Sequence, residues 1–143
     1  MTHSPAKVRV VLVVAAALVR PNGEVLLAQR PEGKAMAGLW EFPGGKVEAG
    51  ERPETALSRE LSEELGVAVE EAALTPLTFA SHSYDDFHLL MPLYLCRTWS
   101  GDITPKENQA VGWVAPTDLF DYPAPAADLP LFEALQSLPE GQA

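Results

Sequence analysis

GKVEAGERPETALSRELSEELGV, which runs from Gly45 to Val67, is the stretch that decides the fold. Leucines recur at every fourth position in its second half, and acidic residues stand beside them. Pro53 suits the first turn of a helix, and Gly66 suits the position just past a helix end. The stretch therefore predicts a helix that begins near Pro53 and stops at Gly66.

Position around the helix axis decides which of these side chains can meet. At roughly 100° per residue, the leucines from Leu57 to Leu65 form one stripe that should face the core. Three glutamates fall within an arc of about 100° directly beside it, in the order Glu64, Glu60 and Glu63. Like charges held this close repel each other unless a cation lies among them. The arc fits a hard cation such as Mg²⁺ or Mn²⁺, although three glutamates alone would also suit a solvated acidic face.

The spacing of the whole stretch carries a resemblance to a known family. It reads G-x5-E-x7-R-E-U-x-E-E-x-G-U, with U an aliphatic residue, and resembles the Nudix box at every position. The segment Gly38–Lys46 and the strand around Trp113 extend the resemblance over most of the chain. Within the family the chain is most similar to the MutT-type nucleotide pyrophosphatases.

This resemblance implies a fold and an activity. The implied fold is α+β, an α/β/α sandwich around a mixed sheet, in one domain over residues 1–143 with loose tails at 1–6 and 139–143. The implied reaction converts a nucleoside triphosphate into a monophosphate and pyrophosphate through water attack at the β-phosphorus. Expected substrates are 8-oxo-dGTP first, for cleaning the nucleotide pool, and CTP or dCTP second. The alternatives are a Nudix pyrophosphatase for ADP-ribose or a dinucleotide, and a non-catalytic nucleotide-binding module.

The metal site is implied residue by residue. The family's metal-binding glutamates correspond to Glu60, Glu63 and Glu64, with the Gly44 carbonyl and Glu107, from a later loop, as further ligands. Mg²⁺ is the expected cofactor, and Mn²⁺ could replace it. Either Glu60 or Glu107 is expected to take the proton of the attacking water. Glu107 would otherwise be an exposed loop residue.

Substrate contacts are expected at the end of a strand and beside the turn that Gly44 and Gly45 are expected to form. Arg30 and Lys46 correspond to family positions that contact phosphates, and both would also suit surface charges. Glu41 and Phe42, in the segment before the glycines, are expected to contact the substrate.

Base recognition is expected near Asp128. In MutT itself an asparagine stands at about this place. An ionised carboxylate only accepts hydrogen bonds, so Asp128 could accept one from the N7–H of 8-oxoguanine or from an exocyclic amine. It also suits the N-cap of a helix expected near residues 129–138. Aromatic side chains that could stack on a base are Phe42, Phe79, Tyr84, Phe87 and His88.

Arg59 and Cys96 are given structural roles. Arg59 projects about 100° away from Glu60 around the helix axis, so we expect it to orient carboxylates, with Glu51 as a partner. Cys96 is the single cysteine and is expected to be buried in a strand.

Composition limits the possible partners. With 143 residues and 47% hydrophobic content, the chain is long enough for a full core. A net charge of −10 argues against a polymer of DNA or RNA held on a broad basic surface. It allows a small nucleotide whose charge a bound metal offsets locally.

The N-terminal apolar run has two interpretations. Val10–Val19 follows Lys7 and Arg9 and resembles a secretory leader. Its β-branched residues favour a buried strand instead, and Asn22-Gly23 predicts a hairpin to a second strand. The run is too short to span a bilayer, so we expect a cytoplasmic protein with no membrane partner. The strands are expected near residues 8–19, 24–30, 39–42, 67–69, 77–84, 87–98 and 111–115.

Overall fold

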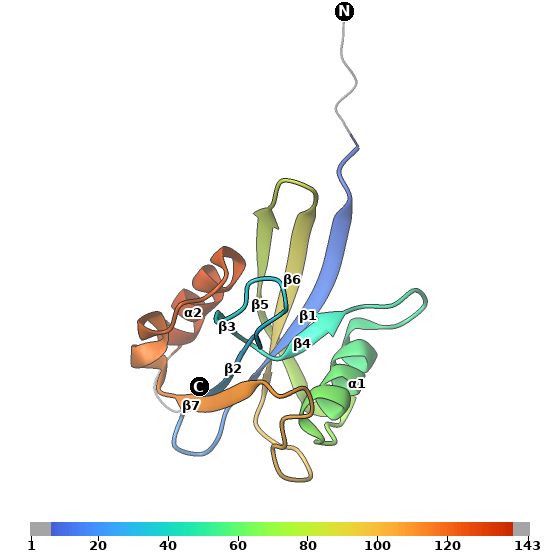
Figure 1. Cartoon of the computed structure of the whole chain (residues 1–143). Coiled ribbons are helices and arrows are strands. Elements are labelled where there is room, and N and C mark those ends of the chain that lie inside the picture. Colours follow the sequence, from blue (N-terminus) through green and yellow to red (C-terminus); the bar gives the residue numbers. More distant parts are fainter. Residues whose placement is uncertain (1–6, 139–143) are drawn as a thin grey trace, which may run out of the picture.

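Two β-sheets and two α-helices organise the computed structural model, which describes residues 7–138 (Figure 1). The strands are β1 (Val10–Leu18), β2 (Val25–Gln29), β3 (Trp40–Glu41), β4 (Gly44–Lys46), β5 (Leu74–Ser83), β6 (His88–Cys96) and β7 (Ala110–Val114). The helices are α1 (Pro53–Leu65) and α2 (Leu129–Gln136), with short 3-10 turns at Glu71–Ala73, Pro116–Asp121 and Ala126–Asp128. The tails predicted at 1–6 and 139–143 lie outside the described residues.

The larger sheet is mixed, as predicted. Its order is β4-β1-β6-β5, with β1 parallel to β6 and the other neighbours antiparallel. The smaller sheet is antiparallel, in the order β3-β2-β7. The helices α1 and α2 flank the sheets on opposite sides (Figure 1). This arrangement confirms the α+β fold expected from the sequence.

Strand β1 separates two hydrophobic cores. Ala15 and Ala17 belong to the core that contains α2, while Val14, Ala16 and Leu18 belong to the core under α1. Successive side chains of a strand point to opposite faces, so covering both faces buries an unbroken apolar run. The run that resembled a leader is thus a central strand of the fold.

Helix α1 forms where the sequence predicts it. Pro53 stands in its first turn, and Gly66 follows its end in the left-handed conformation, with φ of 70°. The Gly66 N–H donates to the Ser62 carbonyl, which closes the last turn. The leucine stripe is fully buried against the sheet, and each such side chain contributes roughly 1.5–3 kcal/mol. This burial fixes which face of α1 the glutamates occupy.

The predicted hairpin is only partly correct. Asn22 and Gly23 do make the turn after β1, but β1 and β2 belong to different sheets. Within residues 7–138 their pairing is limited to one isolated bridge, between Val19 and Val25. The reason is that β1 pairs along its length with β6, so β2 instead pairs with β7 and β3.

Other differences concern short strands. The two glycines expected to form a turn are part of β4, which pairs with β1. The strand expected at 67–69 is reduced to one bridge between Ala68 and Ser100. Strand β5 starts at Leu74, earlier than expected. Short 3-10 turns form at Glu71–Ala73, before β5, and at Pro116–Asp121, after β7. In the described range, no helix has the length and apolar character needed to cross a membrane.

Candidate active site

The glycines of β4 allow the box helix to approach the sheet. A Cβ atom at Gly44 would overlap the carbonyl oxygen of Val14 in the neighbouring strand. A Cβ atom at Gly45 would overlap the carboxylate of Glu60. Any larger residue would separate the strands or displace the glutamate. The glycines therefore place the carboxylate of Glu60 against the edge of the sheet.

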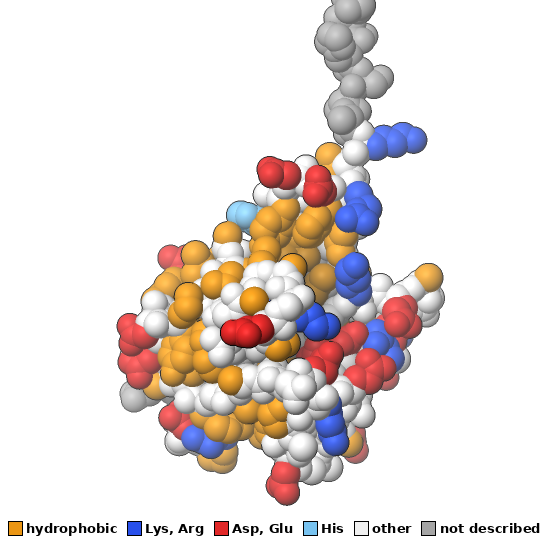
Figure 2. Space-filling view, in the orientation of Figure 1, with side chains coloured by type: hydrophobic (Ala, Val, Ile, Leu, Met, Phe, Trp, Pro, Cys, Tyr) orange, Lys and Arg blue, Asp and Glu red, His pale blue; other side chains and the backbone are white. Residues whose placement is uncertain are grey.

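The three box glutamates differ in exposure in the predicted order. The side chain of Glu60 is 17% exposed and that of Glu63 is 60% exposed. Glu64 is half-buried, and its Oε2 accepts a hydrogen bond from the Gly44 N–H at 3.2 Å. Glu60 and Glu64 therefore face the β4 end of the sheet, whereas Glu63 lies toward solvent. Acidic side chains gather over this region of α1 and β4 (Figure 2).

Arg59 organises the loop between β4 and α1. Its Nε donates to Oε2 of Glu51 at 2.8 Å and its second terminal nitrogen donates to Oε1 at 3.0 Å. The same guanidinium group contacts Glu60 at 3.0 Å and the Lys46 carbonyl at 3.2 Å. The two hydrogen bonds from Arg59 hold the pKa of Glu51 at about 2. The predicted contact between Arg59 and Glu51 is confirmed.

Glu64 forms no ion pair with any described residue. Burial, followed by the charge of Glu60, raises its pKa to about 8, although the Gly44 N–H favours the ionised form. Burial also raises the pKa of Glu60, against the effect of Arg59. The charge of Glu107 acts in the same direction on both. A cation among these carboxylates would relieve this repulsion.

Carboxylate oxygens are the donors that Mg²⁺ and Mn²⁺ prefer, so the chemistry of this cluster fits a divalent metal. Within residues 7–138, however, no three acidic, histidine or cysteine side chains converge closely enough to enclose an ion. Glu60 is instead turned to Arg59, and Glu64 to the Gly44 amide. The ligand set, including the Gly44 carbonyl, therefore stays a prediction.

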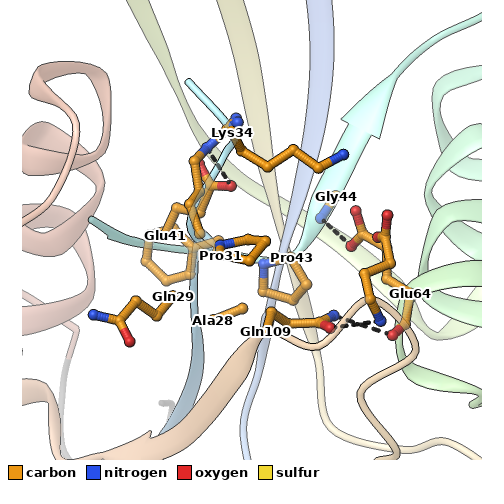
Figure 3. A pocket seen from close by; sticks show the side chains of 12 residues that line it. Ala28, Gln29, Pro31, Lys34, Glu41, Pro43, Gly44, Glu64 and Gln109 are labelled. Atoms are coloured by element: carbon orange, nitrogen blue, oxygen red, sulfur yellow. Dashed lines mark hydrogen bonds and ion pairs between the residues drawn. The ribbon is translucent and has the colours of Figure 1, made fainter. Parts of the chain in front are cut away.

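A cleft of about 210 Å³ opens beside Glu64 (Figure 3). Strand β2, the loop after it, strand β4 and the loop before β7 all contribute to its walls. The lining residues are Ala28, Gln29, Arg30, Pro31, Lys34, Glu41, Phe42, Pro43, Gly44, Glu64, Glu107 and Gln109. The cleft brings together six of the residues predicted from the sequence: Arg30, Glu41, Phe42, Gly44, Glu64 and Glu107.

Arg30 and Glu41 form an ion pair on one wall of the cleft. The Nε of Arg30 lies 3.0 Å from Oε1 of Glu41. This approach lacks the alignment of a hydrogen bond, so the buried Nε has no hydrogen-bond acceptor among the described residues. Burial raises the pKa of Glu41, against the effect of Arg30. Opposite charges thus hold Arg30 and Glu41 together on this wall.

Lys46 is not placed in this cleft. Its side chain is exposed at the end of β4, outside the lining residues, while its carbonyl holds Arg59. Two cleft residues with useful chemistry were missed by sequence reasoning, Lys34 and Gln109. Lys34 belongs to the loop between β2 and β3. The sequence offered only a weak signal for Lys34, a single positive charge between Gly33 and Gly38.

Asp128 lies on the α2 side and is only 3% exposed. Asp128 occupies the N-cap position of α2, as expected, but its side chain makes no capping hydrogen bond to the helix. Its Oδ2 instead accepts a hydrogen bond from the Phe42 N–H at 3.4 Å. Burial, followed by the charge of Glu41, raises the pKa of Asp128 to about 7. A neutral carboxyl group can donate a hydrogen bond as well as accept one.

The aromatic candidates fall into different environments. Phe42 is buried and packs edge-to-face on Phe132, with ring centroids 5.5 Å apart. Tyr84 stacks on Phe87 and lies near Ala127 and Asp128. The other two candidates face elsewhere: Phe79 is 62% exposed, and both ring nitrogens of His88 contact serine hydroxyls.

Comparisons with known proteins agree with one another. A family model described as NUDIX domain matches residues 14–134. The CTP pyrophosphohydrolase of Escherichia coli K12 is 41% identical over 127 residues, covering 87% of this chain and 91% of that protein. The 8-oxo-dGTP diphosphatase of the same organism is 33% identical over 128 residues, covering 89% and 98%.

Solved structures give the same result. The solution structure of the E. coli ORF135 protein superposes with a TM-score of 0.81 at 36% identity, covering 92% of this chain and 91% of that one. The crystal structure of the MutT NUDIX hydrolase from Burkholderia pseudomallei gives 0.76 at 34% identity, covering 92% and 99%.

Proposed function

The chain belongs to the Nudix hydrolase family, and on that premise we propose that it hydrolyses a nucleoside triphosphate to a monophosphate and pyrophosphate. The main support for this proposal is that the glutamates of the Nudix box meet the cleft at Glu64. Glu64 borders a cleft whose opposite wall carries Arg30 and Lys34. Acidic metal ligands on one side and cations on the other suit a metal-bound polyphosphate.

Nudix hydrolases generally use a divalent metal, and we assign Mg²⁺, with Mn²⁺ as a substitute, to the carboxylate cluster. Glu60, Glu64 and Glu107 would hold it, together with the Gly44 carbonyl and, at the outer edge, Glu63. Bound metal supplies charge neutralisation at the phosphates and a more acidic water. The raised pKa of Glu64 supports this assignment, because it reflects burial beside Glu60 without a facing cation.

The side chains of this protein have distinct tasks in that reaction. Arg30 and Lys34 carry their positive charges on the wall of the cleft, so both can bind phosphate oxygens. Lys46 could reach only phosphates that extend past β4. Glu60 or Glu107 accepts the proton of the attacking water, since both carboxylates lie beside Glu64. Glu41 orients Arg30.

The base is proposed to lie on the far side of Phe42, toward Asp128 and Tyr84. With a pKa of about 7, Asp128 exists in both protonation states near neutrality. The ionised form can accept from the N7–H of 8-oxoguanine, and the neutral form can also donate to O6. This supports 8-oxo-dGTP as the first candidate. The ionised form equally suits the amine of cytosine, and the similarity to a CTP pyrophosphohydrolase favours CTP or dCTP as the second.

Such an enzyme would clean the nucleotide pool, and we place that work in the cytoplasm. The test is a substrate panel with Mg²⁺: 8-oxo-dGTP, dGTP, CTP, dCTP, ADP-ribose and a dinucleotide, with products identified by chromatography. Monophosphate and pyrophosphate from a triphosphate would support the proposal. Two monophosphates from ADP-ribose or a dinucleotide would replace it with the other Nudix class. Binding without turnover would indicate a non-catalytic module.

A further inference from the structure

The loop of residues 104–109 lies against the C-terminal end of α1. The Thr104 N–H donates to the Leu65 carbonyl at 2.8 Å, and the Lys106 N–H donates to the Glu64 carbonyl at 2.9 Å. A helix leaves its last carbonyls without donors from its own backbone. The loop supplies those donors, so it is attached to the part of the box that ends in Glu64.

Gln109 adds a second attachment through its side chain. Its Nε2 donates to the Glu64 carbonyl at 3.2 Å, and its Oε1 accepts from the Glu107 N–H at 2.8 Å. Figure 3 shows Gln109 beside Glu64 at the edge of the cleft. One amide group therefore links the backbones of two residues whose carboxylates border the same cleft.

The loop has a physical need for this link. Glu107 is exposed, and the next residue, Asn108, adopts the left-handed conformation with φ of 60°. The carboxylates of Glu60 and Glu64 repel the Glu107 carboxylate, which favours movement of the loop away from α1. Gln109 is half-buried and uncharged, so it can oppose that movement without neutralising any carboxylate.

We infer that Gln109 is a positioning residue, which holds Glu107 beside the box glutamates by joining the Glu107 amide to the Glu64 carbonyl. The inference rests on the proposed function of this site, because it assigns Glu107 a role there. It gives the loop a defined position before substrate arrives. Gln109 itself transfers no proton and binds no metal.

Gln109→Met tests the link directly, because methionine has a similar shape but forms neither hydrogen bond. Hydrogen exchange of the free protein should show the Glu107 amide exchanging about three- to tenfold faster, as expected for loss of one hydrogen bond. The matched control is Gln136→Met, since the exposed Gln136 amide also donates to a backbone carbonyl, that of Pro116. This control should leave the Glu107 amide unchanged. Unchanged exchange in Gln109→Met would overturn the inference.

Coupling to Glu107 distinguishes positioning from general stabilisation. Gln109→Met should weaken Mn²⁺ binding or turnover about 10-fold or more, as outer partners of metal ligands do. In a Glu107→Gln background the same substitution should reduce Mn²⁺ binding or turnover by less than about twofold, because the two residues act as a unit. An equal loss in both backgrounds, or no effect of Glu107→Gln, would contradict the inference. Gln109→Glu, which keeps only the acceptor for the Glu107 N–H, serves if Gln109→Met does not fold.

These readouts separate the two proposals. Hydrogen exchange and Mn²⁺ binding require no substrate, so they decide the role of Gln109 even if the substrate panel shows no turnover. If Gln109 and Glu107 are coupled as expected but no triphosphate is hydrolysed, the result would count against the proposed function alone. If a triphosphate is hydrolysed but Gln109 and Glu107 are not coupled, the result would count against the positioning role of Gln109 alone.

Discussion

At the residue scale, the side chains around Arg59 divide between holding the loop and remaining available for a cation. Glu51 is paired with Arg59 through two hydrogen bonds, and its pKa is low. Among the described residues, the carboxylate of Glu64 accepts a hydrogen bond only from the Gly44 N–H, and its pKa is raised to about 8. Opposite pKa shifts within one box follow from where each carboxylate finds a positive partner. The box is therefore both a structural and a chemical motif.

Separate glutamine substitutions should identify the proton acceptor. Glu60→Gln and Glu107→Gln each remove one candidate while keeping its shape. The acceptor should lose turnover by about two orders of magnitude or more, with Mn²⁺ affinity retained. The other residue should mainly lose Mn²⁺ affinity. Steady-state kinetics and Mn²⁺ titration measure the two effects, and full activity in both variants would refute both assignments.

Asp128 should make stability depend on pH. Its pKa is about 7 in the folded protein and ordinarily 3.8. A group with a raised folded-state pKa binds its proton more tightly when folded, so it costs stability as pH rises from about 4 to 7. Asp128→Asn removes this cost and keeps an acceptor for the Phe42 amide. Urea unfolding should show the variant gaining on the order of a few kcal/mol relative to wild type between pH 4.5 and pH 8. A constant difference would contradict the burial argument.

Single residues also show how far sequence reasoning reaches into the site. The partner of Arg59 and the order of exposure of the box glutamates follow from spacing along one helix, which is local information. Lys34, Gln109 and the real contact of Asp128 depend on which loops meet across the cleft. No periodicity in the sequence encodes those meetings, so sequence position placed Asp128 at the N-cap of α2 but could not give the partner of its side chain.

At the element scale, α1 depends on its leucine stripe. Leu61 is fully buried in the core under α1. Leu61→Ala should lower the free energy of unfolding by about 2–5 kcal/mol, through lost burial and the cavity that remains. Ser62→Ala, one position further along on the exposed side, should change it by less than about 0.5 kcal/mol. Chemical denaturation measures both, and equal effects would show that the stripe does not anchor the helix.

Elements were predictable where their signals were local. The ends of α1 follow from Pro53 and Gly66, and the two-sided burial of β1 follows from its apolar run. The hairpin expectation failed because Asn22-Gly23 specifies a turn but not the sheet that the next strand joins. Strand β4 was missed because glycine is normally a poor strand former. Here close approach to Val14 requires glycine.

At the scale of the whole molecule, charge and fold act together. The chain carries a net charge of −10, yet the proposed substrate is a polyanion. The fold resolves this by directing Arg30 and Lys34 into the cleft and by clustering carboxylates where a divalent metal can bind. Metal removal should therefore abolish both substrate binding and turnover.

The most direct measurement compares pyrophosphate release from a triphosphate, 8-oxo-dGTP or CTP, by wild type and by Glu64→Gln, each with Mg²⁺ and after full chelation. A metal-dependent mechanism at Glu64 predicts release by metal-loaded wild type, none after chelation, and a loss of about 100-fold or more in Glu64→Gln at a melting temperature no lower than that of wild type. Turnover that persists after chelation, or in Glu64→Gln at the wild-type rate, would contradict it.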